Sequence, residues 1–312
     1  MRIFLAGDTG AIGRRLVPML LDEGHEVTGA SRSPERAAAL DAAGAHGVAC
    51  DALDAKAVRE TLEQVRPEAV IHELTSIPAA IDPRTMERDF ELNDRLRSEG
   101  TRILVDAAQA VGAQRIVAQS IAFSYRPGRA GTIHDEQDPL IAGAEAARPY
   151  ARSAEAVRAL EKTVLAAGGI VLRYGYFYGP GTAIVRDGST GEAVKARRLP
   201  VIGGGHGVWS FVHIDDAAAA TVAALDRGTP ASAYNIVDDA PAEAREWIPA
   251  LAEALGARPP LRLPAWLARP LAGAYGVQVM TKAQGASGAR ARQELGWTPA
   301  HPSWREGFET GL

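Results

Sequence analysis

Short apolar runs alternate with amphipathic stretches along the first half of the chain. The runs, which have the length and composition of strands, lie at Arg2–Ala6, Glu26–Ala30, His46–Cys50, Ala69–His72 and Arg115–Gln119. Stretches with helical periodicity separate them, at Ala11–Glu23, Pro34–Ala43, Asp54–Val65 and near Thr85–Val111. Such alternation predicts an α/β fold, a doubly wound parallel sheet with helices on both faces.

The pattern changes after one more helix–strand unit, Ser153–Ala167 and Ile170–Arg173. Gly and Pro are dense from Gly179 to Gly207, and one further clear strand, Tyr234–Val237, follows. The remaining helical stretches are Asp215–Leu225, Ala242–Leu255 and Leu261–Tyr275. We therefore expect a sheet domain over residues 1–178, rejoined by the strand near 234–237. Residues 179–312 are expected to form a smaller, mostly helical substrate lobe.

Composition excludes several classes of partner. The 312 residues carry a net charge of −4 with acids and bases interspersed, so neither nucleic acid nor an anionic membrane is an expected partner. No stretch approaches the roughly 20 apolar residues of a membrane helix. The strand that begins at Arg2 leaves no room for a signal peptide.

Cysteine and histidine usage bears on compartment and metals. Cys50 is the single cysteine, which excludes an internal disulfide and a cysteine-based metal site and favours the reducing cytoplasm. The seven histidines lack metal-ligand spacing, so no metal site is expected.

A glycine-rich turn, residues 7–13 (GDTGAIG), lies between the first strand and the first helix. Gly7 suits a tight turn, Gly10 allows close approach of a pyrophosphate, and Gly13 allows close helix–strand packing. The N-terminus of the following helix offers N–H groups and partial positive charge to phosphates. In this strand–turn–helix context the motif predicts a Rossmann-type dinucleotide-binding domain.

The end of the second strand indicates which dinucleotide binds. A site for NAD places an acid there to bind the ribose 2′-hydroxyl. This chain has Ser31 and Arg32 instead, with Arg36 one turn on, and a guanidinium suits a 2′-phosphate. We expect NADP rather than NAD, the alternative being that Arg32 is only a solvated helix-start residue. Asp51, after the third strand, is either an adenine contact or a helix N-cap.

Seven further short motifs follow one another along the chain. They are residues 70–75 (VIHELT), Asn93 with 100–102 (GTR), 115–120 (RIVAQS), 172–174 (LRY), 178–181 (YGPG), 211–216 (FVHIDD) and 295–299 (LGWTP). With the glycine turn and Asp51, they make the chain resemble extended or atypical short-chain dehydrogenases/reductases of the NAD(P)-dependent epimerase/dehydratase group. The resemblance implies cofactor contacts at Gly7, Thr9, Gly10, Ala11, Ile12, Gly13, Ser31, Arg32, Asp51, Ala52, Leu74 and Thr75.

The same resemblance implies a catalytic Ser or Thr after the fifth strand and a Tyr-x-x-x-Lys motif on the next helix. In that family the Tyr exchanges a proton with substrate while hydride moves to or from nicotinamide, and the Lys lowers the Tyr pKa. Ser120 and Tyr150 are the best candidates here, but the Lys position holds Ala154. Without the lysine, the Tyr150 pKa is expected to stay near the ordinary value of about 10.

Two loops are candidates for the substrate side. Tyr174, Tyr176, Phe177 and Tyr178 follow the sixth strand, where the family places nicotinamide and substrate contacts; aromatic packing at a domain junction is the alternative. The glycine-rich loop at 203–207, followed by Trp209, resembles the family's substrate loop, or is a plain connection. Tyr176 and Trp209 are the predicted substrate contacts. Asp215 and Asp216 are interpreted as helix caps.

These observations favour an NADP-dependent oxidoreductase or epimerase/dehydratase-like enzyme for a small hydroxylated or carbonyl substrate. An isomerisation or elimination would depend less than alcohol oxidation does on the family's set of Ser, Tyr and Lys. The alternative is an NADP(H)-binding sensor without turnover, because a sensor would keep the Gly7 turn and lose the Tyr-x-x-x-Lys motif. A homodimer is compatible with the resemblance.

Overall fold

Seven parallel strands form the central sheet, in the order β12-β7-β5-β4-β1-β2-β3. The computed structural model describes residues 1–78, 81–82, 85–129 and 131–312. The strands are β1 Arg2–Ala6, β2 Glu26–Ser31, β3 His46–Ala49, β4 Ala69–His72, β5 Arg115–Ile121, β7 Ile170–Tyr174 and β12 Ser232–Ile236. The strand order reverses between β1 and β4, which is where a doubly wound fold binds its ligand. The predicted Rossmann-type architecture is confirmed.

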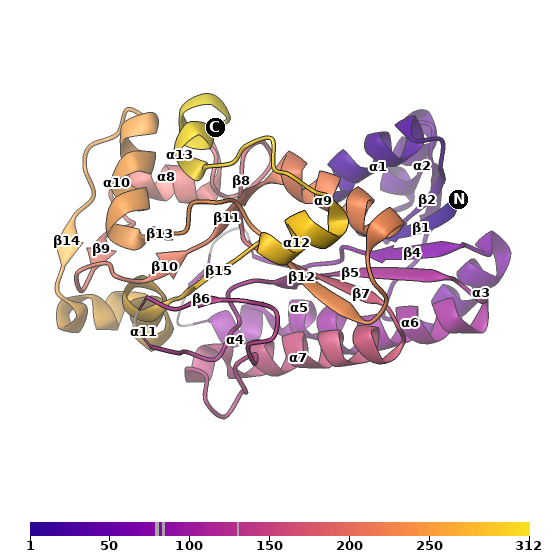
Figure 1. Ribbon diagram of the computed structural model, residues 1–312, viewed down its shortest axis with the longest axis horizontal. Coiled ribbons are helices and arrows are strands. Elements are labelled where there is room, and N and C mark those ends of the chain that lie inside the picture. Colours follow the sequence, from indigo (N-terminus) through magenta and orange to yellow (C-terminus); the bar gives the residue numbers. More distant parts are fainter. Residues whose placement is uncertain (79–80, 83–84, 130) are drawn as a thin grey trace.

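Helices cover both faces of this sheet (Figure 1). The helices are α1 Gly13–Asp22, α2 Pro34–Ala42, α3 Ala55–Val65, α6 Thr101–Ala110, α7 Ala151–Ala166, α9 Ile214–Arg227 and α12 Ala289–Leu295. Helices α3, α6 and α7 lie on one face, and α1 and α9 lie on the other. Leu5, Leu16 and Leu172 belong to the core under α1 and α9, whereas Phe4, Leu62 and Leu160 belong to the opposite core. Alternate residues of one strand therefore face different cores.

The stretch near Thr85–Val111 is helical but not continuous. It divides into α4 Met86–Asp89, α5 Glu91–Arg95, a π-helical turn η1 Leu96–Gly100, and α6. A wide turn inside a helix changes which side chains face its neighbours. A 3₁₀ turn, η2 Arg148–Tyr150, similarly precedes α7.

A second group of elements packs beside the carboxyl ends of the sheet strands. Its helices are α8 Ser189–Lys195, α10 Ala244–Ala254, α11 Ala265–Lys282 and α13 Trp304–Thr310. Its strands are β6 Ile133–His134, β8 Tyr176–Tyr178, β9 Val201–Ile202, β10 Val208–Trp209, β11 Phe211–His213, β13 Ala242–Glu243, β14 Arg262–Leu263 and β15 Gly285–Ala286. They pair as β8–β11, β9–β14, β6–β15 and antiparallel β10–β13. Buried Trp247 and Trp304 fill the core of this lobe.

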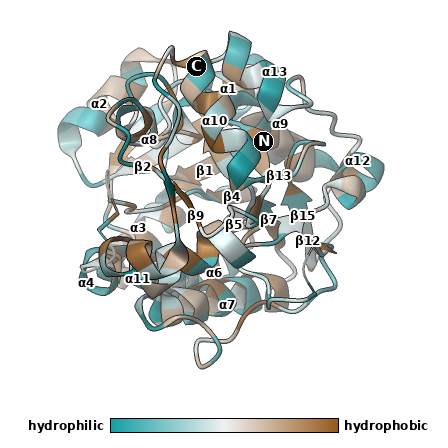
Figure 2. Ribbon diagram, turned by 90° about the vertical axis from the view of Figure 1, so that its left-hand side faces the viewer, coloured by the Kyte–Doolittle hydropathy of each residue, from teal (hydrophilic) through white to brown (hydrophobic). Residues whose placement is uncertain are grey.

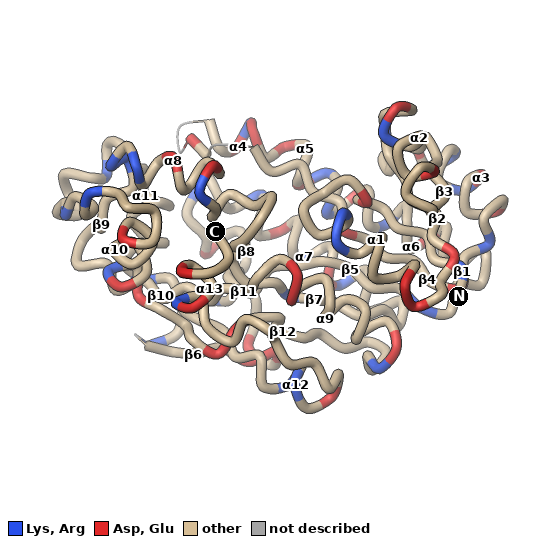
Figure 3. The backbone as a smooth tube through the Cα atoms, turned by 90° about the horizontal axis from the view of Figure 1, so that it is seen from above, with Lys and Arg blue, Asp and Glu red and all other residues tan. Residues whose placement is uncertain are grey.

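Charged and polar residues lie mainly on the outer helices. Figure 2 shows α2 and α13 largely hydrophilic, and Figure 3 shows Lys and Arg interspersed with Asp and Glu along the whole molecule. Within the described residues, no helix is long and apolar enough to cross a membrane.

Candidate functional site

The glycine turn has the geometry that the sequence predicted. Gly7 has a φ of +105°, which favours glycine, and a Cβ there would lie 2.6 Å from the Glu73 carbonyl carbon. A Cβ on Gly13 would lie 2.2 Å from the Gly7 carbonyl oxygen. One on Gly10 would lie 3.2 Å from the same oxygen and meets nothing else described within 4 Å. Gly7 and Gly13 are therefore required by the fold, while Gly10 leaves the outer side of the turn open.

The remaining residues of the turn contribute backbone more than side chain. Ile12 is buried in the core, and Thr9 and Ala11 are half-buried. No described side chain caps the N-terminus of α1. Backbone N–H groups at this end of α1 suit the phosphates of a dinucleotide.

Asp8, inside the turn, was not among the predicted site residues. It is 2% exposed, and neither carboxylate oxygen has a hydrogen-bond partner among the described residues. It lies against β2, since a Cβ on Gly29 would approach its Cβ to 3.0 Å. Burial raises the pKa of Asp8 from 3.8 to about 6, opposed by the nearby backbone N–H groups of Asp8 and Thr9 and then by the Arg36 charge. A polar residue between the first two glycines was the available sequence signal.

Two exposed arginines follow β2. Ser31 is buried, and its hydroxyl accepts a 3.3 Å hydrogen bond from the Ser33 amide. Arg32 and Arg36 are both exposed, and the Arg36 amide is bonded to the Ser33 hydroxyl that caps α2. Their guanidinium groups are thus available to an anion beside the turn.

The edges of β3 and β4 carry the other predicted cofactor contacts. Asp51 is exposed and accepts a hydrogen bond from the Leu53 amide, while Ala52 is buried. The alternative that Asp51 caps the next helix is wrong, because Asp54 accepts from the Lys56 and Ala57 amides at the start of α3. Leu74 is half-buried and Thr75 exposed, and the backbone of Glu73 and Leu74, just after β4, faces Gly7.

A cleft lies between the segments that follow β5 and β7 and helix α11. The residues that line it are Phe123, Tyr125, Pro127, His134, Ile141, Ala147, Tyr150, Tyr176, Tyr275, Gln278, Val279, Lys282, Ala283 and Gln284. The space inside it that a water-sized sphere can reach is about 60 Å³, and the cleft opens to solvent on one side. Tyr176 stacks on Phe123 with ring centroids 4.2 Å apart, and Tyr150 stacks on Tyr275 at 5.0 Å. The cleft is therefore walled by aromatic rings.

The two predicted substrate contacts take different places. Tyr176 lines the cleft, whereas Trp209 stacks behind it at 3.9 Å and is absent from the described lining. Two further aromatic residues of this segment are structural: Tyr174, the last residue of β7, donates to Glu73 in the core, and Tyr178 is fully buried. The packing alternative thus holds for these two residues.

Tyr150 lines the cleft, and its hydroxyl donates a 2.9 Å hydrogen bond to Ser124, not to Ser120. Ser120 is 1% exposed and donates to Glu161, which forms a buried ion pair with Arg173. Ser124 lies four residues farther along, where the chain has left β5 and turned towards η2.

Burial, and not only the absence of the lysine, determines the pKa of the Tyr150 phenol. It raises the pKa of the phenol above its ordinary value of 10, opposed by the Ser124 hydrogen bond and the Arg97 charge. The expectation of an unshifted pKa is therefore wrong. Ala154 lies one helical turn further on and is fully buried.

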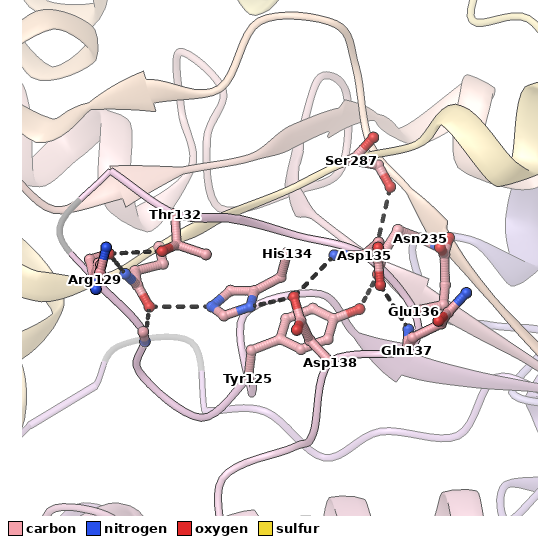
Figure 4. A network of polar contacts seen from close by, with 12 residues as sticks. Tyr125, Arg129, Thr132, His134, Asp135, Glu136, Gln137, Asp138, Asn235 and Ser287 are labelled. Atoms are coloured by element: carbon pink, nitrogen blue, oxygen red, sulfur yellow. Dashed lines mark hydrogen bonds and ion pairs between the residues drawn. The ribbon is translucent and has the colours of Figure 1, made fainter.

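A polar network supports one side of the cleft (Figure 4). The Tyr125 hydroxyl donates to Asn235 at 2.6 Å, which links this loop to the end of β12. His134 contacts Asp138 through Nδ1 at 2.8 Å and Gln284 through Nε2 at 3.1 Å. The network fixes segments from both lobes relative to each other.

The acids after β11 do not cap α9 as predicted. His213 is the N-cap, accepting from the Asp215 amide, because Asp215 and Asp216 already lie within the first turn. Asp216 accepts from the Ala300 and His301 amides. The His213 and His301 rings stack at 3.8 Å beside it, the one described cluster with possible metal ligands. The hydrogen bonds of Asp216 to the Ala300 and His301 amides explain this cluster as an anchor of the C-terminal segment.

Comparisons with known proteins agree with this geometry. The model of the NAD dependent epimerase/dehydratase family matches residues 3–237. The "3-diazoavenalumate denitrifying reductase" of a Streptomyces species is 44% identical over 311 residues, covering 99% of each chain. A ketoreductase of Stigmatella aurantiaca, named for a 4-hydroxy-2-methyl-3-oxo-4-farnesyl-3,4-dihydroquinoline-1-oxide, is 28% identical over 82% of this chain and 74% of its own.

Solved structures share the fold. UDP-glucose 4-epimerase of Thermotoga maritima with UDP-glucose superposes with a TM-score of 0.77 at 20% identity, over 100% of this chain and 97% of its own. The Thermus thermophilus enzyme with NAD gives 0.74 at 23%, with the same coverage. The interpretation as an enzyme of the NAD(P)-dependent short-chain dehydrogenase/reductase type is confirmed by the family match and the relatives named as reductases. The chain belongs to the NAD dependent epimerase/dehydratase family.

Proposed function

We propose that the protein is an NADP(H)-dependent reductase that acts on a small aromatic carboxylate bearing a diazo group, which leaves as dinitrogen. The observation that carries the proposal is the aromatic cleft whose described lining combines Tyr150, bonded to Ser124, with one Lys or Arg side chain, Lys282. The 44% identity to a reductase named for a diazo carboxylate supports the choice of reducible group.

The turn residues fit a dinucleotide. Gly10 leaves space where a pyrophosphate would approach, and exposed Arg32 and Arg36 would pair with a 2′-phosphate. The reduced cofactor, when bound, supplies the hydride. Every other requirement of the reaction falls on the residues of the cleft.

Tyr150 is the proposed proton donor. An aromatic diazonium with an ortho or para hydroxyl loses the phenol proton at neutral pH and becomes a neutral diazo ketone. Hydride at the carbon that carries N₂ and a proton at the oxygen then yield the phenol, with a C–H bond in place of the C–N bond, and N₂. Because burial raises the Tyr150 pKa above 10, the phenol keeps its proton at neutral pH and is suited to donate it. Ser124 accepts the phenol hydrogen bond and so orients Tyr150 before transfer. This role replaces Ser120, whose hydroxyl is engaged by Glu161.

The cleft also fits the rest of such a substrate. Phe123 and Tyr275, which each stack on one described ring, would contact an aromatic or conjugated body, while Tyr176 is sandwiched between Phe123 and Trp209 and supports that wall. Lys282 is exposed on α11 and is the one Lys or Arg among the described lining residues. Its ammonium group would pair with a carboxylate at the mouth of the cleft.

The test uses a diazotised aminophenol that carries a carboxylate, with NADPH and the purified protein. We expect oxidation of NADPH, release of N₂ and formation of the phenol carboxylate in equal amounts, all lost in Tyr150→Phe. Reduction of the matching aromatic ketone without any N₂ release from the diazo compound would contradict the diazo assignment. It would favour a ketoreductase.

A further inference from the structure

A buried arginine lies in the π-helical turn that packs against α7. Arg97 is 4% exposed, and its Nε has no hydrogen-bond partner among the described residues. Leaving a buried guanidinium without matched partners costs free energy, and π-helical turns often occur at functional sites. We therefore looked for a function of Arg97 in the residues around it.

The face of the helix that carries Arg97 is held against α7 beside Tyr150. Asp94, one turn before Arg97, accepts a 3.0 Å hydrogen bond from Ser153, the neighbour of Ala154. The second Asp94 oxygen, Oδ1, is buried without a partner. Asp94 in α5 and Arg97 in η1 are both buried, and both of these elements pack against α7.

The ionisable groups around this point come from three elements. Asp94, Tyr150 and Tyr275 are the groups whose ionised forms would favour the charged Arg97 and oppose the fall of its pKa on burial. Arg97, Asp94 and Glu161 act in turn on the Tyr150 phenol, with Arg97 favouring the phenolate and the two acids opposing it. Among the described groups that affect the Tyr150 phenol, Arg97 is therefore the one with a positive charge.

We propose that Arg97 serves Tyr150 as the positioning cation in place of the lysine that is absent at Ala154. Fully buried Ala154 leaves no charge one turn after Tyr150, and the nearby guanidinium is carried by η1, which packs against α7, instead of by α7 itself. Once Tyr150 has donated its proton, Arg97 stabilises the phenolate that remains. This inference rests on the proposed role of Tyr150 but not on the identity of the substrate.

The experiment compares Arg97→Met, Arg97→Lys and the double variant Arg97→Met/Ala154→Lys, with Arg95→Met as control. Arg95 is an exposed arginine on the preceding turn, paired with Glu99. Phenolate absorbance in the apo protein, minus that of the matching Tyr150→Phe variant, reports the Tyr150 titration without cofactor or substrate. NADPH affinity and kcat against KM are measured in parallel.

We expect Arg97→Met to move the Tyr150 titration, and the basic limb of the pH–rate profile, to higher pH. It should lower kcat about tenfold or more with little change in KM. Arg97→Lys and the double variant should restore the wild-type Tyr150 titration and kcat, and Arg95→Met should change neither the titration nor kcat. If Arg97→Met does not fold, the double variant carries the comparison against wild type. An unmoved Tyr150 titration in a folded variant, or loss of NADPH affinity alone, would overturn the assignment, and failure to turn over a diazo substrate would not bear on it.

Discussion

Tyr150 and Ser124 are joined by a 2.9 Å hydrogen bond between side chains that are 26 residues apart in the sequence. Tyr150 ends a 3₁₀ turn, and Ser124 lies in the loop after β5, so the pair exists only because η2 packs over that loop. Both side chains are buried, which keeps the phenol protonated at neutral pH. The pair therefore presents a proton donor to the cleft.

The first prediction concerns this donor. Tyr150→Phe should lower turnover of a reducible substrate by about 10² to 10⁴-fold, because general-acid catalysis contributes that much. NADPH affinity should stay unchanged in a calorimetric titration. Ser124→Ala should give a smaller loss in kcat, while Ser120→Ala should mainly lower stability, since Glu161 loses a buried donor worth about 1–3 kcal/mol. Equal kcat losses in both serine variants, at equal stability, would count against Ser124.

Cofactor preference is the second prediction. Wild type should bind NADPH more tightly than NADH, because Arg32 and Arg36 are exposed beside the turn and no acid ends β2. Arg32→Asp should reverse the preference by adding repulsion of a 2′-phosphate. Fluorescence titration with both cofactors measures the ratio. A ratio that Arg32→Asp leaves unaltered would mean that Arg32 points away from the cofactor.

The third prediction separates the two roles of the glycines. Gly10→Val should sharply lower NADPH affinity while the circular dichroism spectrum and Tm stay near wild type, because a Cβ there meets only the Gly7 carbonyl, at 3.2 Å. Gly13→Ala is the contrast: its Cβ would lie 2.2 Å from the Gly7 oxygen, so the fold itself should be destabilised. A Gly10→Val protein with wild-type affinity would show that no pyrophosphate approaches this position.

Asp8 provides a pH-dependent prediction. Its folded pKa is raised from 3.8 to about 6, so the folded state holds a proton that the unfolded state has lost between these values. Stability therefore falls as pH rises through this window, and above it the buried carboxylate costs up to about 3 kcal/mol. Asp8→Asn should raise the free energy of unfolding at about pH 8 but not at about pH 4. Urea denaturation at both values tests this; an equal gain at both would assign the effect to packing.

Substrate charge is the subject of the last prediction. Lys282→Met should raise KM for a carboxylate substrate about tenfold with kcat nearly unchanged, since an exposed ammonium at the mouth contributes binding rather than chemistry. Lys282→Arg should retain the wild-type KM. The methyl ester of the substrate is the control, because it should lose the dependence on Lys282. A KM for the ester that rises in parallel would show that Lys282 only shapes the cleft.

The sequence by itself determined the sheet domain and its glycine turn. Strand–helix alternation and the spacing of Gly7, Gly10 and Gly13 are local, so their geometry followed from a few neighbouring residues, and the structure has it. The exposed arginine after β2 could be found for the same reason. The π-helical turn and the paired short strands could not, because local propensity does not encode such irregularities.

The tertiary structure alone decided the chemistry of the cleft. The sequence favoured Ser120 as the serine partner of Tyr150, but in the fold Ser120 donates to the buried Glu161, and Ser124 accepts from Tyr150. Lys282 reaches the same cleft from more than a hundred positions away, through the packing of α11 on η2. A sequence pattern records the order of residues, whereas a site depends on which side chains converge once distant elements have packed, and burial then sets their charge.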